Sequence, residues 1–319
     1  MSKLGAQEQA LMQRIKAGGF RPASEIPLAE SRNGLTQMAI VMAGPKAEVG
    51  AISDRKIPGP GGDLPIRIYR PEGHVKGLRP VALYFHGGGF YLGNLETHDH
   101  VCRFLCRNAG VIVIAVDYRL APEHKFPAAI EDCYAALCWT VKNAAKEGFD
   151  ANRVALVGDS AGGTIVVSVC LMARQKGGPK IAYQVSVYPA LTVDDGEDFP
   201  SRRALGSGEY FIAHDDFAFF RQLYLENPDR DAQNPLASPI RAKDYAKLPP
   251  ALVIAAEFDP CVDEDAYYAE RLKADGVDTE YVCFKGTLHP FFLFDGVLDA
   301  GRQGQKLVAE RVRTRLKVG

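Results

Sequence analysis

Short apolar runs recur along the chain, and in its later part helical patterns separate one run from the next. Each run predicts a buried strand, because a strand covered on both faces is apolar nearly throughout. The apolar spacing at residues 127–139 is typical of the helical segments between them. Strands that alternate with helices predict an α/β fold with a mostly parallel sheet. The predicted strands lie near residues 80–86, 111–117, 153–158, 183–188, 251–257 and 279–284.

Three other stretches differ from this alternation. Residues 51–71 predict a hairpin that turns at Gly59-Pro-Gly-Gly62. Residues 1–48 precede the first predicted strand, and residues 194–240 interrupt the pattern with an acidic run followed by aromatic residues. Ligands bind at the carboxyl ends of the strands in parallel α/β sheets, so residues directly after strands are the first candidates for a site.

A glycine-rich turn follows the strand predicted at 153–158 and precedes a helical pattern. It reads Gly158-Asp-Ser-Ala-Gly-Gly163, with Ser160 at its apex. A sharp strand-to-helix turn pushes the serine hydroxyl out of the backbone, and glycine two residues before and after it avoids steric collision. A plain glycine-serine loop is the alternative interpretation. The turn makes Ser160 a candidate nucleophile for acyl transfer.

A second glycine run, His86-Gly-Gly-Gly89, follows the strand predicted at 80–86. Ester hydrolysis passes through a tetrahedral intermediate with a negative oxygen, which backbone N–H groups stabilise. Consecutive glycines offer such donors with no side chain in the way. Alone, the run could be a bend. Together with the turn at Ser160, it predicts an oxyanion hole made by the N–H groups of Gly88, Gly89 and Ala161.

A nucleophile turn of this type is followed in the chain by an acid and then by a histidine. Downstream of Ser160 the chain has only His214, in the irregular segment, and His289, in a loop just after a predicted strand. Asp259 comes at the carboxyl end of another predicted strand, before a proline. We therefore expect His289 to be the general base and Asp259 to hold it in the correct tautomer.

The acidic residues around Asp259 allow a second interpretation. Asp263, Glu264 and Asp265 suit the first turn of a helix, where negative charge complements the helix dipole. Asp259 could itself be only a helix cap. Its position at a strand end, between Ser160 and His289 in the chain, favours the catalytic role.

These motifs resemble those of the hormone-sensitive-lipase-like carboxylesterases, the bacterial lipolytic family IV of the α/β-hydrolase fold. With Asp159 directly before Ser160, the turn is similar to that of the GDSAG-type members of this family. The chain departs from the family pattern in two places: Cys261 and Val262 follow an Asp-Pro that often continues with Leu in the family, and Pro290 stands where Gly is common. The resemblance spans most of the chain and rests on residues 86–90, 93–99, 117–123, 158–163, 259–264 and 289.

The resemblance implies a serine carboxylesterase that hydrolyses short- to medium-chain esters through an acyl-enzyme and needs no cofactor. It implies a helical cap made of residues 1–48 and 194–240 over a catalytic domain of residues 49–193 and 241–319. It also implies that Asp117, Arg119 and Glu123 brace loops through ion pairs, that His86 shapes the glycine loop, and that a homodimer is possible. The aromatic residues expected to wall the substrate pocket are Phe90, Tyr91, Tyr188 and Phe211.

Two other functions use the same motifs. An amidase or a lactonase would form an acyl-enzyme with the same three residues, and the leaving group depends on the pocket. A ligand-binding relative that had lost part of the triad would be a receptor. The chain keeps serine, aspartate and histidine in order, which argues against the receptor.

Composition agrees with an enzyme that acts on a small molecule. The chain has 319 residues, 47% of them hydrophobic, and 38 basic against 39 acidic residues give a net charge of −1. Nothing in this balance indicates nucleic acid or a membrane surface as a partner. The first residues form no apolar signal region, and no apolar run approaches the roughly 18 residues of a membrane span, so we expect a cytoplasmic protein.

The cysteines and one pair of histidines raise the question of a metal. Seven cysteines show no paired metal spacing, and Cys102 and Cys106 suit one buried face of a helix. A cytoplasmic location makes disulfides unexpected. His98 and His100 are two residues apart and do not share a helix face, and the family motif at 93–99 explains them better. We therefore expect no metal site.

Overall fold

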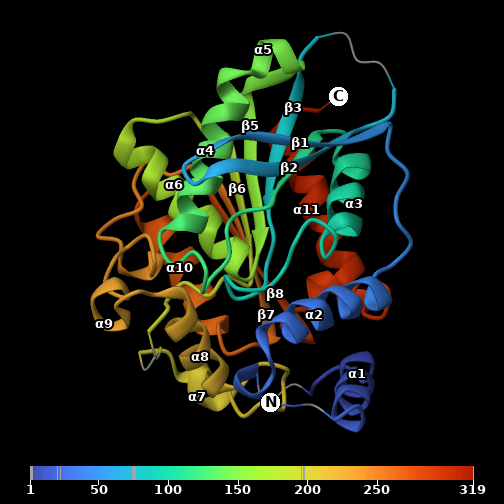
Figure 1. Cartoon of the computed structure of the whole chain (residues 1–319), viewed down its shortest axis with the longest axis vertical. Coiled ribbons are helices and arrows are strands. Elements are labelled where there is room, and N and C mark those ends of the chain that lie inside the picture. Colours follow the sequence, from blue (N-terminus) through green and yellow to red (C-terminus); the bar gives the residue numbers. More distant parts are fainter. Residues whose placement is uncertain are drawn as a thin grey trace.

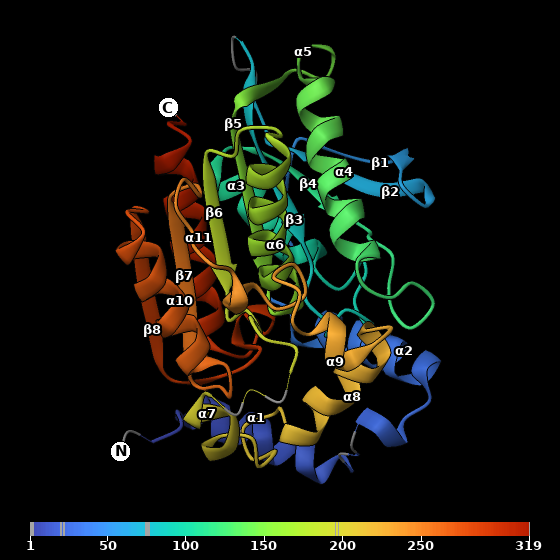
Figure 2. The same ribbon diagram turned by 90° about the vertical axis from the view of Figure 1, so that its left-hand side faces the viewer.

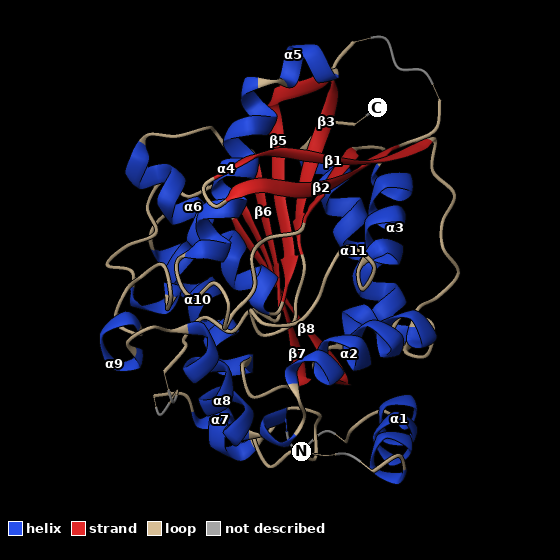
Figure 3. Ribbon diagram, viewed as in Figure 1, coloured by secondary structure: helices blue, strands red, loops and turns tan. Residues whose placement is uncertain are grey.

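A twisted sheet of eight strands forms the centre of the computed structural model, which describes residues 3–19, 21, 23–73, 77–194, 196 and 198–318 (Figures 1 and 3). The strand order is β1-β2-β4-β3-β5-β6-β7-β8. The first two strands form the predicted antiparallel hairpin, β2 also pairs antiparallel with β4, and the remaining pairs are parallel. The strands are β1 (Ala51–Gly59), β2 (Gly62–Arg70), β3 (Arg79–Phe85), β4 (Ile112–Val116), β5 (Phe149–Asp159), β6 (Tyr183–Val187), β7 (Ala251–Phe258) and β8 (Thr279–Leu288).

Helices cover both faces of the sheet, and this explains why the central strands are apolar throughout. In Figure 1, α4, α6 and α10 lie on one face, and α3 and α11 lie on the other. Alternate residues of β3 belong to two separate core clusters, with Leu83 and Phe85 in one and Ala82 and Tyr84 in the other. These helices are α3 (Asp99–Ala109), α4 (Ala128–Lys142), α6 (Ala161–Lys176), α10 (Val262–Ala274) and α11 (Asp299–Arg315), with the short α5 (Ala144–Glu147) before β5.

The two segments that interrupt the strand pattern come together beyond the carboxyl ends of the parallel strands. We call the helices they contribute the helical layer. Figure 2 shows this layer at one end of the molecule, below β6, β7 and the start of α6. The layer contains α1 (Ala6–Ala17) and α2 (Leu28–Met42) from the first segment, and α7 (Pro200–Ala204), α8 (His214–Tyr224) and α9 (Pro228–Asp231) from the second.

The predicted domain boundaries stay a prediction. Residues 1, 2, 20 and 22 of the first segment and 195 and 197 of the second lie outside the described residues. The described residues also include three single turns of 3-10 helix, at Ala23–Glu25, Pro239–Arg241 and Phe291–Leu293. Among the helices of the described residues, none combines the length and the apolar character that crossing a membrane would require.

Two strands are longer than their apolar runs predict. β5 begins at Phe149, four residues before the predicted strand, and β8 continues to Leu288. The added residues include polar ones such as Asp150 and Lys285, which lie at the sheet margins and are not fully buried. The extension of β8 brings His289 to the residue directly after a strand.

Candidate active site

Ser160 occupies a strained turn between β5 and α6. Its backbone angles are φ 52° and ψ −124°, a region that residues with a side chain rarely adopt. A Cβ on Gly158 would collide with the backbone of Gly162, and one on Gly162 would collide with the carbonyl oxygen of Phe85. The Ser160 N–H donates to the carbonyl of Val187 at 2.8 Å, which ties the turn to β6. The sequence argument for the two glycines is therefore confirmed.

The three side chains singled out in the sequence lie in one hydrogen-bonded line. The Ser160 hydroxyl lies 2.9 Å from Nε2 of His289, and Nδ1 of the same ring lies 2.7 Å from Oδ2 of Asp259. Because a carboxylate only accepts, Nδ1 carries the proton and Nε2 is free to accept from the serine. Asp259 is completely buried, and its other oxygen accepts from the N–H of Cys261 at 2.9 Å.

The other acids near Asp259 form no hydrogen bond to His289: three have partners elsewhere, and the buried carboxylate of Asp265 has no hydrogen-bond partner among the described residues. Glu257 accepts from the N–H of Gly286 at 2.8 Å, and Asp263 accepts from the N–H of Ser201 at 2.8 Å. Glu264 forms a buried ion pair with Arg202. Asp259 is thus the acid that faces His289.

The glycine loop after β3 brings free donors to the same place. Gly88 and Gly89 have φ of 124° and 59°, which supports the use of glycine at these positions. Both line one cavity together with Ser160 and Ala161. Among the described residues, none accepts a backbone hydrogen bond from Gly88, Gly89 or Ala161. Ala161 is the first residue of α6, where N–H groups have no partner within the helix.

Two neighbours hold the glycine loop in shape. Nδ1 of His86 lies 2.9 Å from the carbonyl oxygen of Gly87, and the Tyr118 hydroxyl donates to the carbonyl of His86 at 2.6 Å. Burial and the nearby His98 lower the pKa of His86 to about 4, so this ring is neutral at pH 7. His86 therefore contacts the loop, as expected, and has no hydrogen bond to the three side chains described above.

A cavity of about 480 Å³ opens above Ser160, between the sheet and the helical layer. Its lining is mainly apolar, and both segments of the layer contribute to it, for example through Leu35 and Met38 of α2 and Phe217 and Phe220 of α8. The aromatic residues at 217–220 belong to the segment 194–240 and were not predicted to line the pocket. The spacing of aromatic residues along a helix does not show whether they face the protein core or a cavity.

Three of the four predicted pocket walls line this cavity, namely Phe90, Tyr91 and Phe211. Tyr188 does not, and that prediction needs correction. Its side chain is completely buried behind the base, with its ring centroid 4.3 Å from that of His289. The residue directly follows β6, where its N–H donates to the carbonyl of Ile254 at 2.6 Å, and its ring packs on Phe291.

Sequence reasoning missed Arg32, which joins α2 to the loops around the site. Its guanidinium donates to the carbonyls of Tyr91 and Ala121, both at 2.9 Å, and pairs with Glu123 at 2.7 Å. Glu123 belongs to the motif expected to brace loops through ion pairs, but its partner lies in the first segment. Arg119 of the same motif pairs instead with Asp132 at 2.8 Å.

The chain is similar to known proteins along most of its length. Residues 82–293 match the family model described as alpha/beta hydrolase fold. "Carboxylic ester hydrolase LipN" of Mycobacterium tuberculosis is 41% identical over 80% of this chain and 68% of its own length. "Ethyl acetate hydrolase" of Pseudomonas putida is 34% identical over 98% of both chains. The solved structure of a hyperthermophilic esterase from Pyrobaculum calidifontis is 40% identical, covers 98% of both chains and superposes with a TM-score of 0.92.

Proposed function

We propose, since the chain belongs to the α/β-hydrolase fold family, that it is a serine carboxylic ester hydrolase acting on short- to medium-chain esters. The observation that carries the proposal is the hydrogen-bonded line from Ser160 through His289 to Asp259. Ser160, at one end of this line, lies in an apolar cavity beside backbone N–H groups that have no partner among the described residues. The names of the relatives support the same chemistry.

In the acylation step, Nε2 of His289 accepts the hydroxyl proton while Oγ of Ser160 attacks the ester carbonyl carbon. The proton that His289 has taken passes to the leaving alkoxide, which departs as an alcohol. Asp259 stabilises the imidazolium that exists between these two transfers. The carbonyl oxygen becomes negative in the tetrahedral intermediate, and the N–H groups of Gly88, Gly89 and Ala161 donate to it.

In the deacylation step, His289 takes a proton from water, which attacks the acyl-enzyme carbonyl carbon and forms a second tetrahedral intermediate. This intermediate collapses, the bond from the acyl carbon to Oγ of Ser160 breaks, the carboxylic acid leaves, and the proton passes from His289 to Oγ. The position of Ala161 at the start of α6 adds the positive end of a helix dipole to the oxyanion site. Apart from the ester and the attacking water, the groups named in these steps belong to the chain itself.

The cavity supports a preference for small acyl groups. Its volume of about 480 Å³ falls in the range of sites for small molecules, roughly 300–1,000 Å³. Residues of the helical layer line the cavity on the side away from the sheet, and we propose that this layer, seen at one end of the molecule in Figure 2, acts as a cap that limits chain length. The homodimer and the cytoplasmic location stay predictions.

The proposal is tested by turnover of p-nitrophenyl esters from acetyl to palmitoyl. We expect the highest kcat/KM at short to medium chains and a loss on the order of a millionfold in kcat for Ser160→Ala. Ser53→Ala, on β1 at the far side of the sheet, is the control and should match the wild type. An optimum at long-chain emulsified lipid would contradict the cap, and turnover by Ser160→Ala near the wild-type rate would contradict the mechanism.

A further inference from the structure

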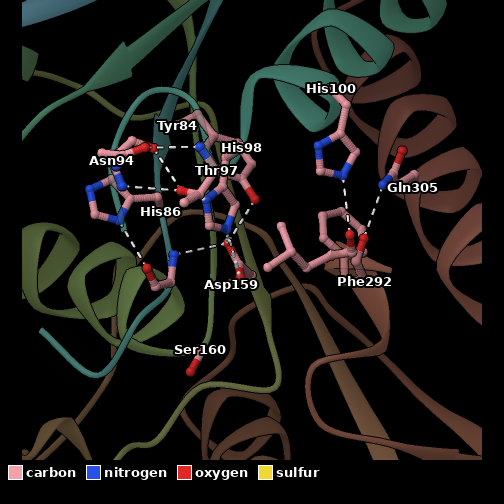
Figure 4. A network of polar contacts seen from close by, with 12 residues as sticks. Tyr84, His86, Asn94, Thr97, His98, His100, Asp159, Ser160, Phe292 and Gln305 are labelled. Carbon is pink, nitrogen blue, oxygen red and sulfur yellow. Dashed lines mark hydrogen bonds and ion pairs between the residues drawn. The ribbon is translucent and has the colours of Figure 1, made fainter. Parts of the chain in front are cut away.

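The carboxylate of Asp159 is a buried charge that the proposed reaction does not use. The residue lies directly before the nucleophile, yet Figure 4 shows its side chain pointing toward His98 while the Ser160 hydroxyl points away. Only 2% of Asp159 is exposed. Its Oδ1 accepts from the Tyr84 hydroxyl at 2.7 Å and from the N–H of Gly87 at 3.2 Å. The second bond joins the nucleophile turn to the loop that carries the proposed oxyanion donors.

His98 is the nearest basic group to this carboxylate. Its Nε2 lies 3.2 Å from Oδ1 and 3.3 Å from Oδ2 of Asp159. The ring is 2% exposed and belongs to the motif at residues 93–99. None of these residues takes part in the proposed reaction steps. Since a carboxylate only accepts hydrogen bonds, Nε2 must carry a proton.

The other ring nitrogen also faces an acceptor. Nδ1 of His98 lies 2.7 Å from Oγ1 of Thr97, which in turn lies 2.7 Å from the carbonyl oxygen of Asn94 (Figure 4). The carbonyl can only accept, so the single hydroxyl proton of Thr97 is directed to it. Oγ1 then accepts from the N–H of Asn94 at 3.1 Å and, with its second lone pair, from a protonated Nδ1. The geometry around His98 is therefore that of a ring with a proton on each nitrogen.

The other titratable groups around Asp159 are neutral at pH 7. Burial and the charge of His98 hold the pKa of His86 at about 4. Burial, with the charge of Asp159, raises the pKa of each remaining group above its ordinary value; these groups are Tyr84, Cys102, Tyr118 and Tyr188. Burial opposes ionisation of Asp159 too, but His98 and the Tyr84 hydroxyl hold its pKa below the ordinary value. Within the described part of the chain, His98 is therefore the group that balances this carboxylate.

We propose that His98 is a positioning residue: as a buried imidazolium it keeps Asp159 ionised, and Asp159 thereby holds Gly87 and the oxyanion loop against the nucleophile turn. The inference rests on the proposed ester hydrolysis. A charged acceptor makes the bond from the Gly87 N–H stronger than a neutral one would. The loop has little freedom at this point, because a Cβ on Gly87 would meet the Asp159 side chain at 2.5 Å.

His98 and His100 contact different parts of the structure. Figure 4 shows His100 directed toward the loop that follows His289, away from Asp159. Its Nε2 lies 3.2 Å from the carbonyl oxygen of Leu293 and 3.2 Å from Oδ1 of Asp295. Among the described residues, no group of three metal-ligating side chains is present.

The protonation state is tested directly by NMR of the wild-type protein labelled with ¹⁵N in its histidine rings. At pH 8 an ordinary histidine, with a pKa of about 6.5, is neutral. We expect the ring that disappears from the spectrum in His98→Gln to show two protonated nitrogens at this pH. A neutral ring would overturn the proposal. This measurement does not depend on ester turnover, so it separates the inference from the proposed function.

The catalytic consequence is tested by a double-mutant cycle of His98→Gln and Asp159→Asn. Loss of one oxyanion donor costs about 10²–10³ in kcat, so a displaced loop should cost roughly tenfold to a hundredfold, with KM changed less than about threefold. Because the two residues act as one unit, the double variant should fall no more than about threefold below Asp159→Asn.

The matched control is Asp132→Asn, which removes an equally buried carboxylate from its pair with the partly exposed Arg119, away from the site. It should lower the melting temperature while kcat stays within about twofold of the wild type. Each of three results would overturn the proposal. The first is a kcat for His98→Gln within twofold of the wild type, the second is additive losses in the double variant, and the third is an equal loss of kcat in Asp132→Asn. A wild type that hydrolyses no ester would contradict the proposed function, and the ring spectrum would still decide the state of His98.

Discussion

Arg202 should be among the residues on which the stability of the molecule depends most. It belongs to α7 in the helical layer, and its guanidinium pairs with Glu264 of α10, with both side chains fully buried. The same guanidinium donates to the carbonyl of Thr192 at 3.1 Å and lies 3.7 Å from the ring centroid of Phe217. Glu264 also accepts from the N–H of Thr192 at 3.0 Å. Arg202→Met removes the positive charge and leaves the negative one buried.

The expected loss follows from that uncompensated charge. Breaking a buried pair by removing one partner costs about 3–5 kcal/mol. A chain of 319 residues has an unfolding entropy of roughly 0.7 kcal/mol/K, so the melting temperature should fall by about 4–7 °C. Replacing both partners, with Arg202→Met and Glu264→Leu, removes the unpaired charge and should recover most of this loss.

The assay is thermal unfolding followed by circular dichroism, with urea titration for the free energy. Lys306→Met is the control, because Lys306 and Glu310 form an exposed pair at 3.9 Å on one helix. Such a pair contributes about 0.5 kcal/mol or less, so its melting temperature should change by under about 1 °C. A shift for Arg202→Met as small as that of the control, or a double variant less stable than Arg202→Met, would refute the reasoning.

Two further predictions concern the loops around the site. Arg32→Ala should lower kcat/KM roughly tenfold because α2 loses its hydrogen bonds to Tyr91 and Ala121. Arg32→Lys should recover only part of this activity, and equal kcat/KM in the wild type and both variants would contradict the prediction. For His86, the folded pKa of about 4 lies below the unfolded 6.5, so its contribution to stability is present above pH 6.5 and is lost as the pH falls toward 4. Urea titrations at pH 7 and pH 5 should show about 2 kcal/mol more acid destabilisation in the wild type than in His86→Gln, and an equal pH dependence would contradict the assignment.

The sequence is sufficient to predict the arrangement of the site where local pattern decides it. Ser160, Asp259 and His289 each directly follow a strand, and parallel strands bring their carboxyl ends to one edge of the sheet. The glycines at 158 and 162 are required by a turn that the sequence also defines. These positions therefore follow from strand periodicity, turn chemistry and the order of serine, acid and histidine along the chain.

The remaining features depend on contacts between distant segments. Arg32 and Arg202 have long side chains on the helical layer, and nothing in the neighbouring sequence indicates that their partners are Glu123 and Glu264. Tyr188 was one of the aromatic residues expected at the pocket wall, but the direction of its ring is fixed by packing behind His289. The protonation state of His98 can be inferred only from the three-dimensional positions of Thr97 and Asn94.

The most direct test of the central claim is to trap the covalent intermediate. The protein would be treated with a p-nitrophenyl alkylphosphonate, which the nucleophile of a serine hydrolase attacks as it attacks an ester, and then digested and analysed by mass spectrometry. The account predicts one adduct, on the hydroxyl of Ser160, loss of ester turnover in proportion to labelling, and no adduct at that peptide in Ser160→Ala. Inactivation with the label on another residue, or full turnover by a protein labelled at Ser160, would contradict it.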